Sequence, residues 1–277
     1  MGYLILAILA SALVSIGVRL SEGRVKCKMC MTAVNYTCCL IISICYAGVG
    51  NLIPDVPGLG FSLGLGSFNG VIYLAVFLLF NYNIRKNGIV LSSIFMKLGL
   101  LVPIIVSILV FKENPNAAQI IGFVTAVAAI ILINYEPGHA IKMRPELLLM
   151  LLGGGAVDVL SKIYEELGAR DLSDQFLLAT FAVALALSVI LLIARKERFG
   201  KYEILIGMLI GIPNFFTAKL TLKALETIPA FITYPTYSVG TILVVTLCGV
   251  AFFRERPRKL QYAAIGIIFV ALALLNL

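Results

Sequence analysis

The chain has 277 residues, of which 61% are hydrophobic and only 13% charged, and its mean hydropathy is +1.04. A soluble domain is typically about 45–50% apolar and about 25% charged, so the composition excludes a soluble protein and predicts a polytopic membrane protein. The net charge of +8 does not indicate nucleic-acid binding, because basic residues of membrane chains gather in cytoplasmic loops.

Ten apolar stretches are long enough to cross a bilayer, which takes about 20 residues in a helix. Lipid offers no partner for backbone polar groups, so the spans must be helices and the fold is expected to be all-α. In chain order they cover residues 3–20, 29–49, 62–83, 88–111, 117–135, 146–166, 174–194, 203–225, 229–253 and 258–276. We therefore expect ten transmembrane helices in two halves of five, residues 1–137 and 145–277.

One hairpin occurs in both halves. Residues 111–115 read Phe-Lys-Glu-Asn-Pro and residues 253–257 read Phe-Arg-Glu-Arg-Pro, and Gln119 and Gln261 keep the same spacing of 142 positions. Internal repeats in membrane chains point first to secondary transporters. Because each half has an odd number of spans, the second half must enter the membrane in the opposite orientation. The sequence thus predicts two inverted five-helix repeats.

Basic residues are concentrated in alternate loops. The other set of loops holds only Lys112 and Arg170. The positive-inside rule places the basic loops in the cytoplasm and both termini outside. We expect a multi-pass protein of the plasma (inner) membrane.

The two halves and their duplicated Phe-x-Glu hairpins resemble the drug/metabolite transporter superfamily, in particular its EamA-like branch. Pro103 and Pro235, in the helix before each hairpin, also fit. The resemblance covers essentially the whole chain. It implies export or exchange of small metabolites by alternating access without ATP, around a cavity lined by the first four helices of each half.

The chain departs from this family in two respects. Family members usually place both termini in the cytoplasm, whereas the loop charges here predict the reverse. The first span, Leu4–Leu20, has no carboxylate. The small multidrug pumps of the superfamily use an acidic residue there to exchange protons for drug cations, so that mechanism is not carried over.

Charged residues within spans mark functional sites by default, because an unpaired charge at a helix centre costs about 2.5–3.5 kcal/mol. Asp158 and Lys162 lie four residues apart and share a helix face, either as a cation or proton site or as a self-neutralising pair. Lys97 is expected to contact substrate or to form a salt bridge with Asp158, and Lys219 is a further candidate for the cavity. We expect Lys97 and Asp158 to face one cavity near mid-membrane.

Polar side chains on other spans are either substrate contacts or interhelical hydrogen bonds. These candidates are Asn35, Asn69, Tyr73, Asn214, Thr217, Tyr234, Tyr237 and Ser238. Glu113 and Glu255 are expected to cap the helices that follow them, where the macrodipole favours an acid. Cys27 and Cys30 form a lone Cys-x-x-Cys without further ligands, and we predict no metal site.

The leading interpretation is a secondary transporter that moves a small polar metabolite across the inner membrane by alternating access. The balance of Lys97, Lys162 and Lys219 against Asp158 favours anionic or zwitterionic substrates, such as amino acids or organic acids. A broad-specificity exporter of amphipathic or toxic compounds is the alternative. An enzyme is not expected, because the only histidine is His139 and no nucleophile–base motif occurs.

The expected partners are the substrate, the lipid bilayer and coupled protons. We predict no cofactor and no nucleic acid. A monomer and a homodimer both remain open.

Overall fold

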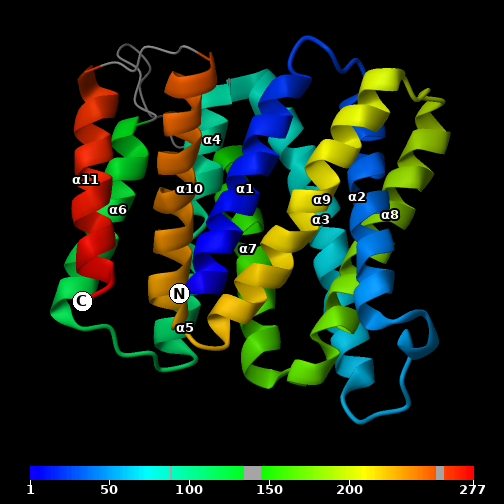
Figure 1. Ribbon diagram of the computed structural model, residues 1–277, viewed down its shortest axis with the longest axis horizontal. Coiled ribbons are helices and arrows are strands. Elements are labelled where there is room, and N and C mark those ends of the chain that lie inside the picture. Colours follow the sequence, from blue (N-terminus) through cyan, green and yellow to red (C-terminus); the bar gives the residue numbers. More distant parts are fainter. Residues whose placement is uncertain (88, 134–144, 254–258) are drawn as a thin grey trace. The chain divides into compact units, whose positions relative to one another are not determined.

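The computed structural model describes residues 1–87, 89–133, 145–253 and 259–277 (Figure 1). The helices are α1 (Gly2–Ser21), α2 (Lys28–Ala47), α3 (Leu59–Asn87), α4 (Ile89–Leu98), α5 (Leu101–Leu109), α6 (Ala117–Ile133), α7 (Pro145–Leu167), α8 (Ser173–Arg195), α9 (Lys201–Leu225), α10 (Ala230–Phe253) and α11 (Lys259–Leu275). Two 3-10 turns, η1 (Val49–Asn51) and η2 (Arg170–Leu172), complete the secondary structure. Within the described ranges there is no strand, which confirms the all-α prediction.

Seven segments of the described chain form helices long and apolar enough to cross a membrane. They are α1, α2, α3 as far as Asn83, α7, η2 together with α8, α9, and α10 as far as Ala251. Three shorter apolar helices cover Phe95–Leu109, Ala117–Leu132 and Ala263–Leu275. The structure thus confirms a multi-pass membrane protein, whereas ten full spans and the inverted relation of the halves stay predictions.

The single helix expected over residues 88–111 is wrong, because the chain forms α4 and α5 with a turn at Gly99–Leu100. Pro103 has no N–H to donate to the carbonyl of Gly99, four residues earlier. The N–H of Val102 donates to that carbonyl instead, at 3.0 Å, so the chain tightens locally into a 3-10 turn.

The helices form two compact units, and each unit combines segments from both halves of the sequence. Unit 1 contains Met1, Ala75–Lys162 and Ala224–Leu277, and unit 2 contains Gly2–Leu74 and Ile163–Lys223. Three helices, α3, α7 and α9, therefore contribute residues to both units. The division into repeats at residues 137 and 145 stays a prediction.

In unit 1, α6 and α11 pack side by side through small residues (Figure 1). Ala126 and Ala129 of α6 are fully buried, as are Ala264 and Ala271 of α11. A side chain at Gly122 would place its Cβ 2.8 Å from the backbone nitrogen of Leu275, so the two backbones touch. Small residues allow this close approach, on which helix association in lipid depends.

Unit 2 uses the same device between α3 and α8. A Cβ at Gly66 would lie 3.0 Å from that of Ala179, and one at Gly70 would lie 3.0 Å from that of Val183. Aromatic side chains fill the space between α2, α8 and α9. This buried aromatic cluster includes Tyr36, Phe176, Phe181 and Phe215.

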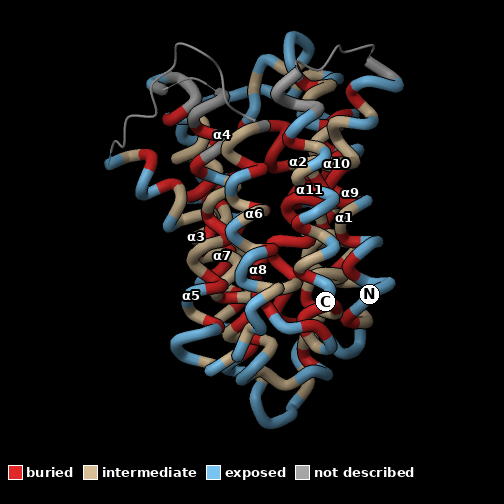
Figure 2. Tube along the Cα trace, turned by 90° about the vertical axis from the view of Figure 1, so that its left-hand side faces the viewer, coloured by how far each residue is buried: buried red, intermediate tan, exposed pale blue. Residues whose placement is uncertain are grey.

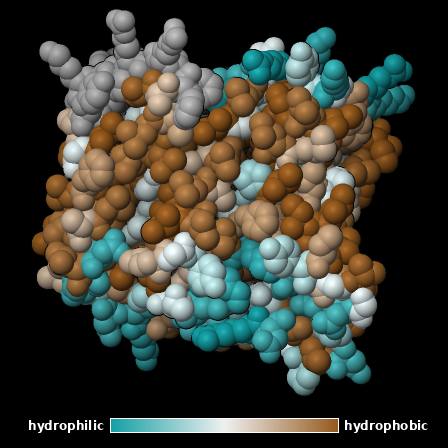
Figure 3. All heavy atoms as spheres, viewed as in Figure 1, coloured by the Kyte–Doolittle hydropathy of each residue, from teal (hydrophilic) through white to brown (hydrophobic). Residues whose placement is uncertain are grey.

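The exposed surface of the helices is apolar. On α1, small residues such as Ala7 and Ala10 are buried while Leu6, Leu9 and Leu13 are exposed. Figure 2 shows exposed residues along the length of the helices, and Figure 3 shows a hydrophobic band with hydrophilic residues gathered at the helix ends. Large exposed apolar surface of this kind fits contact with lipid rather than water.

Unit 2 brings two of the basic connections together. The thiol of Cys30 donates to the carbonyl of Arg198 at 3.5 Å. The Glu203 carboxylate accepts the backbone N–H groups of Lys26 at 2.8 Å and Cys27 at 3.2 Å, just before α2 begins. These contacts agree with the grouping of basic loops in the sequence, and their side of the membrane stays a prediction.

Candidate substrate site

A close helix crossing in unit 1 determines where the charged residues lie. A Cβ at Gly99 would stand 2.9 Å from the backbone nitrogen of Gly155, and one at Gly155 would stand 2.5 Å from the Cβ of Val102. The turn between α4 and α5 therefore packs directly on the backbone of α7. Lys97 precedes this crossing by two residues, and Asp158 follows it by three on α7.

Lys97 and Asp158 are charged groups of opposite sign on two different helices. Each is half-buried, and each feels the charge of the other. Within the described part of the chain, neither side chain has a hydrogen bond or an ion pair. Their charges therefore attract at a distance.

Lys162 has a different environment, although it lies only one turn beyond Asp158 on α7. Its ammonium forms an ion pair with Glu113 at 3.0 Å, and only 3% of its side chain is exposed. The ammonium also lies 5.7 Å from the centre of the Phe111 ring. The sequence interpretation placed Lys162 with Asp158, in a cation or proton site or in a self-neutralising pair, whereas its ion-pair partner in the structure is Glu113 of the Phe-Lys-Glu hairpin.

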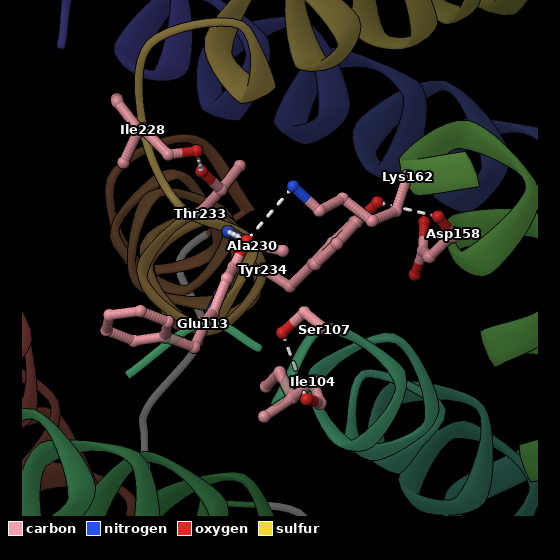
Figure 4. Close-up of polar contacts among 10 residues, drawn as sticks. Ile104, Ser107, Glu113, Asp158, Lys162, Ile228, Ala230, Thr233 and Tyr234 are labelled. Atoms are coloured by element: carbon pink, nitrogen blue, oxygen red, sulfur yellow. Dashed lines mark hydrogen bonds and ion pairs between the residues drawn. The ribbon is translucent and has the colours of Figure 1, made fainter. Parts of the chain in front are cut away.

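Glu113 joins the hairpin to a helix more than one hundred residues away. Its carboxylate oxygens accept the backbone N–H groups of Ala230 at 3.1 Å and Phe231 at 3.2 Å, at the start of α10 (Figure 4). These N–H groups have no partner inside the helix, and an anion there is favoured by the helix macrodipole. Glu113 therefore caps a helix, as expected. The helix is α10, however, and not α6, which follows the hairpin.

The cap of the next helix, α6, is made by two other residues of the hairpin. The side chain of Asn116 accepts from the N–H of Gln119 at 2.8 Å, and the side chain of Gln119 accepts from the N–H of Asn116 at 2.9 Å. This is a reciprocal capping box. The second hairpin, with Glu255 and Gln261, cannot be compared, because residues 254–258 and the side chain of Gln261 lie outside the description.

Tyr234 connects α10 with α7 by a hydrogen bond to the backbone carbonyl of Asp158. Its hydroxyl donates to the Asp158 carbonyl oxygen at 2.7 Å, and its side chain is almost fully buried (Figure 4). Two other candidates on α10 differ in exposure, since Tyr237 is half-buried and Ser238 is buried. The structure thus brings Tyr234, Asp158 and Lys97 to one part of unit 1.

Unit 2 brings together two further candidates, Asn35 on α2 and Asn214 on α9. The amide nitrogen of Asn214 donates to the side-chain oxygen of Asn35 at 3.1 Å. The Cys39 thiol donates to the carbonyl of Gly211 at 3.2 Å, just before Pro213. These bonds join α2 to α9 and favour the interhelical alternative for this pair.

Lys219 is also paired within unit 2. Its ammonium is 2.5 Å from the Asp174 carboxylate and 3.7 Å from the centre of the Tyr46 ring. Both side chains of the ion pair are partly exposed, at 17% and 24%. Asp174 lies in the first turn of α8, which the sequence interpretation had treated only as the beginning of a span.

The other candidates of unit 2 contact neighbouring helices or their own helix. The amide of Asn69 donates to the Thr180 hydroxyl at 3.4 Å, and Tyr73 packs edge-on against Phe181. The Thr217 hydroxyl bonds within α9 to the carbonyl of Pro213 at 2.9 Å.

Sequence reasoning missed Glu203, which is only 5% exposed and caps α2 from the first turn of α9. The partner helix could not be inferred, because Lys26 lies 177 residues earlier.

The sequence matches one family of membrane proteins along nearly its whole length. The EamA-like transporter family matches residues 1–135 and 147–277. An uncharacterized protein of Haemophilus influenzae is 27% identical over 96% of this chain and 94% of that protein. A crystal structure with 16% sequence identity has a similar fold, with a TM-score of 0.75 over 100% of this chain and 99% of that chain.

Proposed function

We propose that this chain, which belongs to the EamA-like transporter family, is a secondary transporter that moves a small zwitterionic metabolite by alternating access. The observation that carries the proposal is the Lys97–Asp158 pair. Two opposite charges sit within apolar helices, half-buried, without a direct ion pair between them. Such charges are costly in lipid and are typical of substrate or ion pathways.

The contacts narrow the substrate class that composition favoured. Lys162 is paired with Glu113, and Lys219 with Asp174, so these two lysines do not add free positive charge. Among the in-span candidates that the structure describes, this leaves one ammonium, on Lys97, and one carboxylate, on Asp158. A zwitterion such as an amino acid offers the complementary carboxylate and ammonium, which fits this pair better than a dianion does.

A bound substrate or proton would compete with the attraction between Lys97 and Asp158. A ligand shifts a conformational equilibrium only by its differential affinity for the two states. Competition for this pair would supply such a difference, because a state in which Lys97 and Asp158 lie further apart would bind the ligand more tightly. We also propose that the direction of transport is export and that the coupling ion is the proton.

The test is transport into proteoliposomes, with a panel of radiolabelled amino acids and organic acids. Lys97→Ala should abolish uptake of the zwitterions while folded protein stays at the wild-type level. Asp158→Asn should remove the pH dependence of uptake. The matched control is Lys86→Ala, because Lys86 is an exposed lysine of the same unit whose partner is Glu146. Normal flux in both site variants would exclude this pair as the site.

The same assay separates the alternative function. An exporter of amphipathic compounds would move lipophilic cations, and its flux would be insensitive to Lys97→Ala. That outcome would favour a site on apolar surface instead of the charged pair.

A further inference from the structure

The first turn of α10 is attached to α7 at two consecutive levels. At the first level, Glu113 accepts from the N–H groups of Ala230 and Phe231 and binds Lys162 of α7 at 3.0 Å. At the second level, one turn along both helices, Tyr234 donates to the carbonyl of Asp158 at 2.7 Å. A single contact would leave the helices free to pivot, whereas two successive contacts resist rotation.

The hairpin conformation supplies the first of these contacts. Lys112 has a φ of 55°, in the left-handed region that residues with a Cβ rarely adopt. The next N–H, of Glu113, donates to the Ser107 carbonyl at 3.1 Å and closes the turn. Phe111 and Glu113 therefore both reach Lys162, through the ring face and the carboxylate.

The second contact reaches the residue that the proposed function places in the substrate site. Tyr234 bonds the backbone carbonyl of Asp158, whose carboxylate feels the charge of Lys97. A displacement of α7 at this residue therefore displaces Tyr234 and the start of α10. The charged and titratable groups of unit 1 around Asp158 are Lys97 on α4, Lys162 with Glu113, and Tyr234.

We propose that Tyr234 and Glu113 are positioning residues which couple the charge state of Asp158 to the packing of the first turn of α10. The proposal rests on the proposed function, since it takes Asp158 as the group that is neutralised during transport. In the charged state, attraction between Asp158 and Lys97 holds α7 in place, and the two contacts hold α10 against it. Neutralisation removes the attraction and loosens the first turn of α10.

The test is a double-mutant cycle read by hydrogen–deuterium exchange of peptides that contain residues 230–234, in the full-length protein in lipid nanodiscs. Asp158→Asn serves as the neutral carboxyl and needs no identified substrate. We expect it to speed exchange of the first turn about fivefold, the ratio that corresponds to one hydrogen bond of about 1 kcal/mol. In the Tyr234→Phe background, Asp158→Asn should have a clearly smaller effect, because only the contact through Glu113 then remains.

Thr233→Val is the matched control. Thr233 is fully buried in the same turn, but its hydroxyl donates to the Ile228 carbonyl of its own segment at 3.1 Å (Figure 4). A merely structural loss of one hydroxyl would affect Thr233→Val and Tyr234→Phe alike. Under the coupling proposal, Asp158→Asn still speeds the exchange of residues 230–234 about fivefold in the Thr233→Val background.

Two results would overturn the coupling. One is an unchanged exchange rate of residues 230–234 in Asp158→Asn, and the other is an equal response in the wild-type and Tyr234→Phe backgrounds. Either result leaves the proposed function standing if Lys97→Ala still abolishes transport. Conversely, normal transport in Lys97→Ala and Asp158→Asn would remove the proposed function, even with the exchange response intact.

Discussion

Two lysine–carboxylate pairs of unit 1 differ in how completely their charges are satisfied. The Lys162–Glu113 pair is in direct contact, its side chains are only 3% and 12% exposed, and Glu113 also binds two backbone N–H groups of α10. Lys97 and Asp158 are half-buried and interact only at a distance within the described residues. A buried charge with a full set of partners holds helices together, whereas a charge with an incomplete set is available to a ligand. Under the proposed function, the number of partners separates a charge that stabilises the fold from a charge that binds substrate.

The largest expected effect is on stability, from Lys162→Met. The change leaves the Glu113 carboxylate buried without its cation, and breaking a buried pair costs about 3–5 kcal/mol. Chemical denaturation in mixed micelles should show this loss in the free energy of unfolding. The free energy of unfolding of Lys97→Met should stay near that of the wild type. Equal losses for the two lysines would erase the distinction between the pairs.

A charge-exchange variant tests whether Glu113 stabilises the fold only through its ion pair with Lys162. The double variant Glu113→Lys/Lys162→Glu restores an ion pair, but a lysine at position 113 cannot accept the N–H groups of Ala230 and Phe231. Each buried donor left unsatisfied costs about 1–3 kcal/mol, so the variant should remain less stable than the wild type. Full recovery of stability would show that the contact with α10 contributes nothing.

Neighbouring glycines of α7 test the crossing that holds Lys97 near Asp158. Gly155→Ala would push a Cβ against Val102 and the backbone of Gly99, and overpacking of this kind costs about 1–3 kcal/mol. Gly154→Ala is the control, because its Cβ would lie 3.5 Å from the nearest atom, the Met96 carbonyl oxygen, at ordinary contact. Flux per folded molecule should fall in the first variant only. Similar behaviour of the two variants would argue against a tight crossing.

The smallest effect is expected for Lys86→Ala. Lys86 binds Glu146 at 3.0 Å, but 47% of its side chain is exposed and water screens the pair. The hydrogen bond to Glu146 raises the pKa of Lys86, so any contribution is present at neutral pH and is lost only as the pH rises through that pKa. Denaturation curves and flux at neutral pH should match the wild type. A clear loss would show that exposed charges at the helix ends matter as much as those within spans.

Local patterns predicted much of the helical structure and some of its local detail. Apolar length predicted most helices. The Asn116–Gln119 capping box was not predicted, although its two residues have the usual spacing of three, because the cap was assigned to Glu113. Pro103 was used only as a feature of the family resemblance, and the break that it causes between α4 and α5 was not predicted. Local propensity and hydrophobic length can therefore be read directly, although competing signals must be weighed against each other.

Long-range pairing could not be predicted in this way. Nothing in the Phe-Lys-Glu hairpin identifies Lys162 or the N-terminus of α10 as its partner, since the contacts lie 49 and 117 residues away in the sequence. Asp158 and Lys162 share a helix face, yet their charges are directed to different partners. Spacing along one helix defines a face, and only the packing of other helices decides what that face contacts.

Lys97 is proposed to bind the ligand and Lys162 to stabilise the fold, and a binding measurement on purified protein distinguishes these roles. A thermal-shift screen of the purified wild type with amino acids identifies a ligand that raises the unfolding temperature, because binding to the folded form stabilises it. Lys97→Met should unfold at the wild-type temperature without ligand and show no shift when the ligand is added. If the ligand raised the unfolding temperature of Lys97→Met as much as that of the wild type, Lys97 would not bind the ligand.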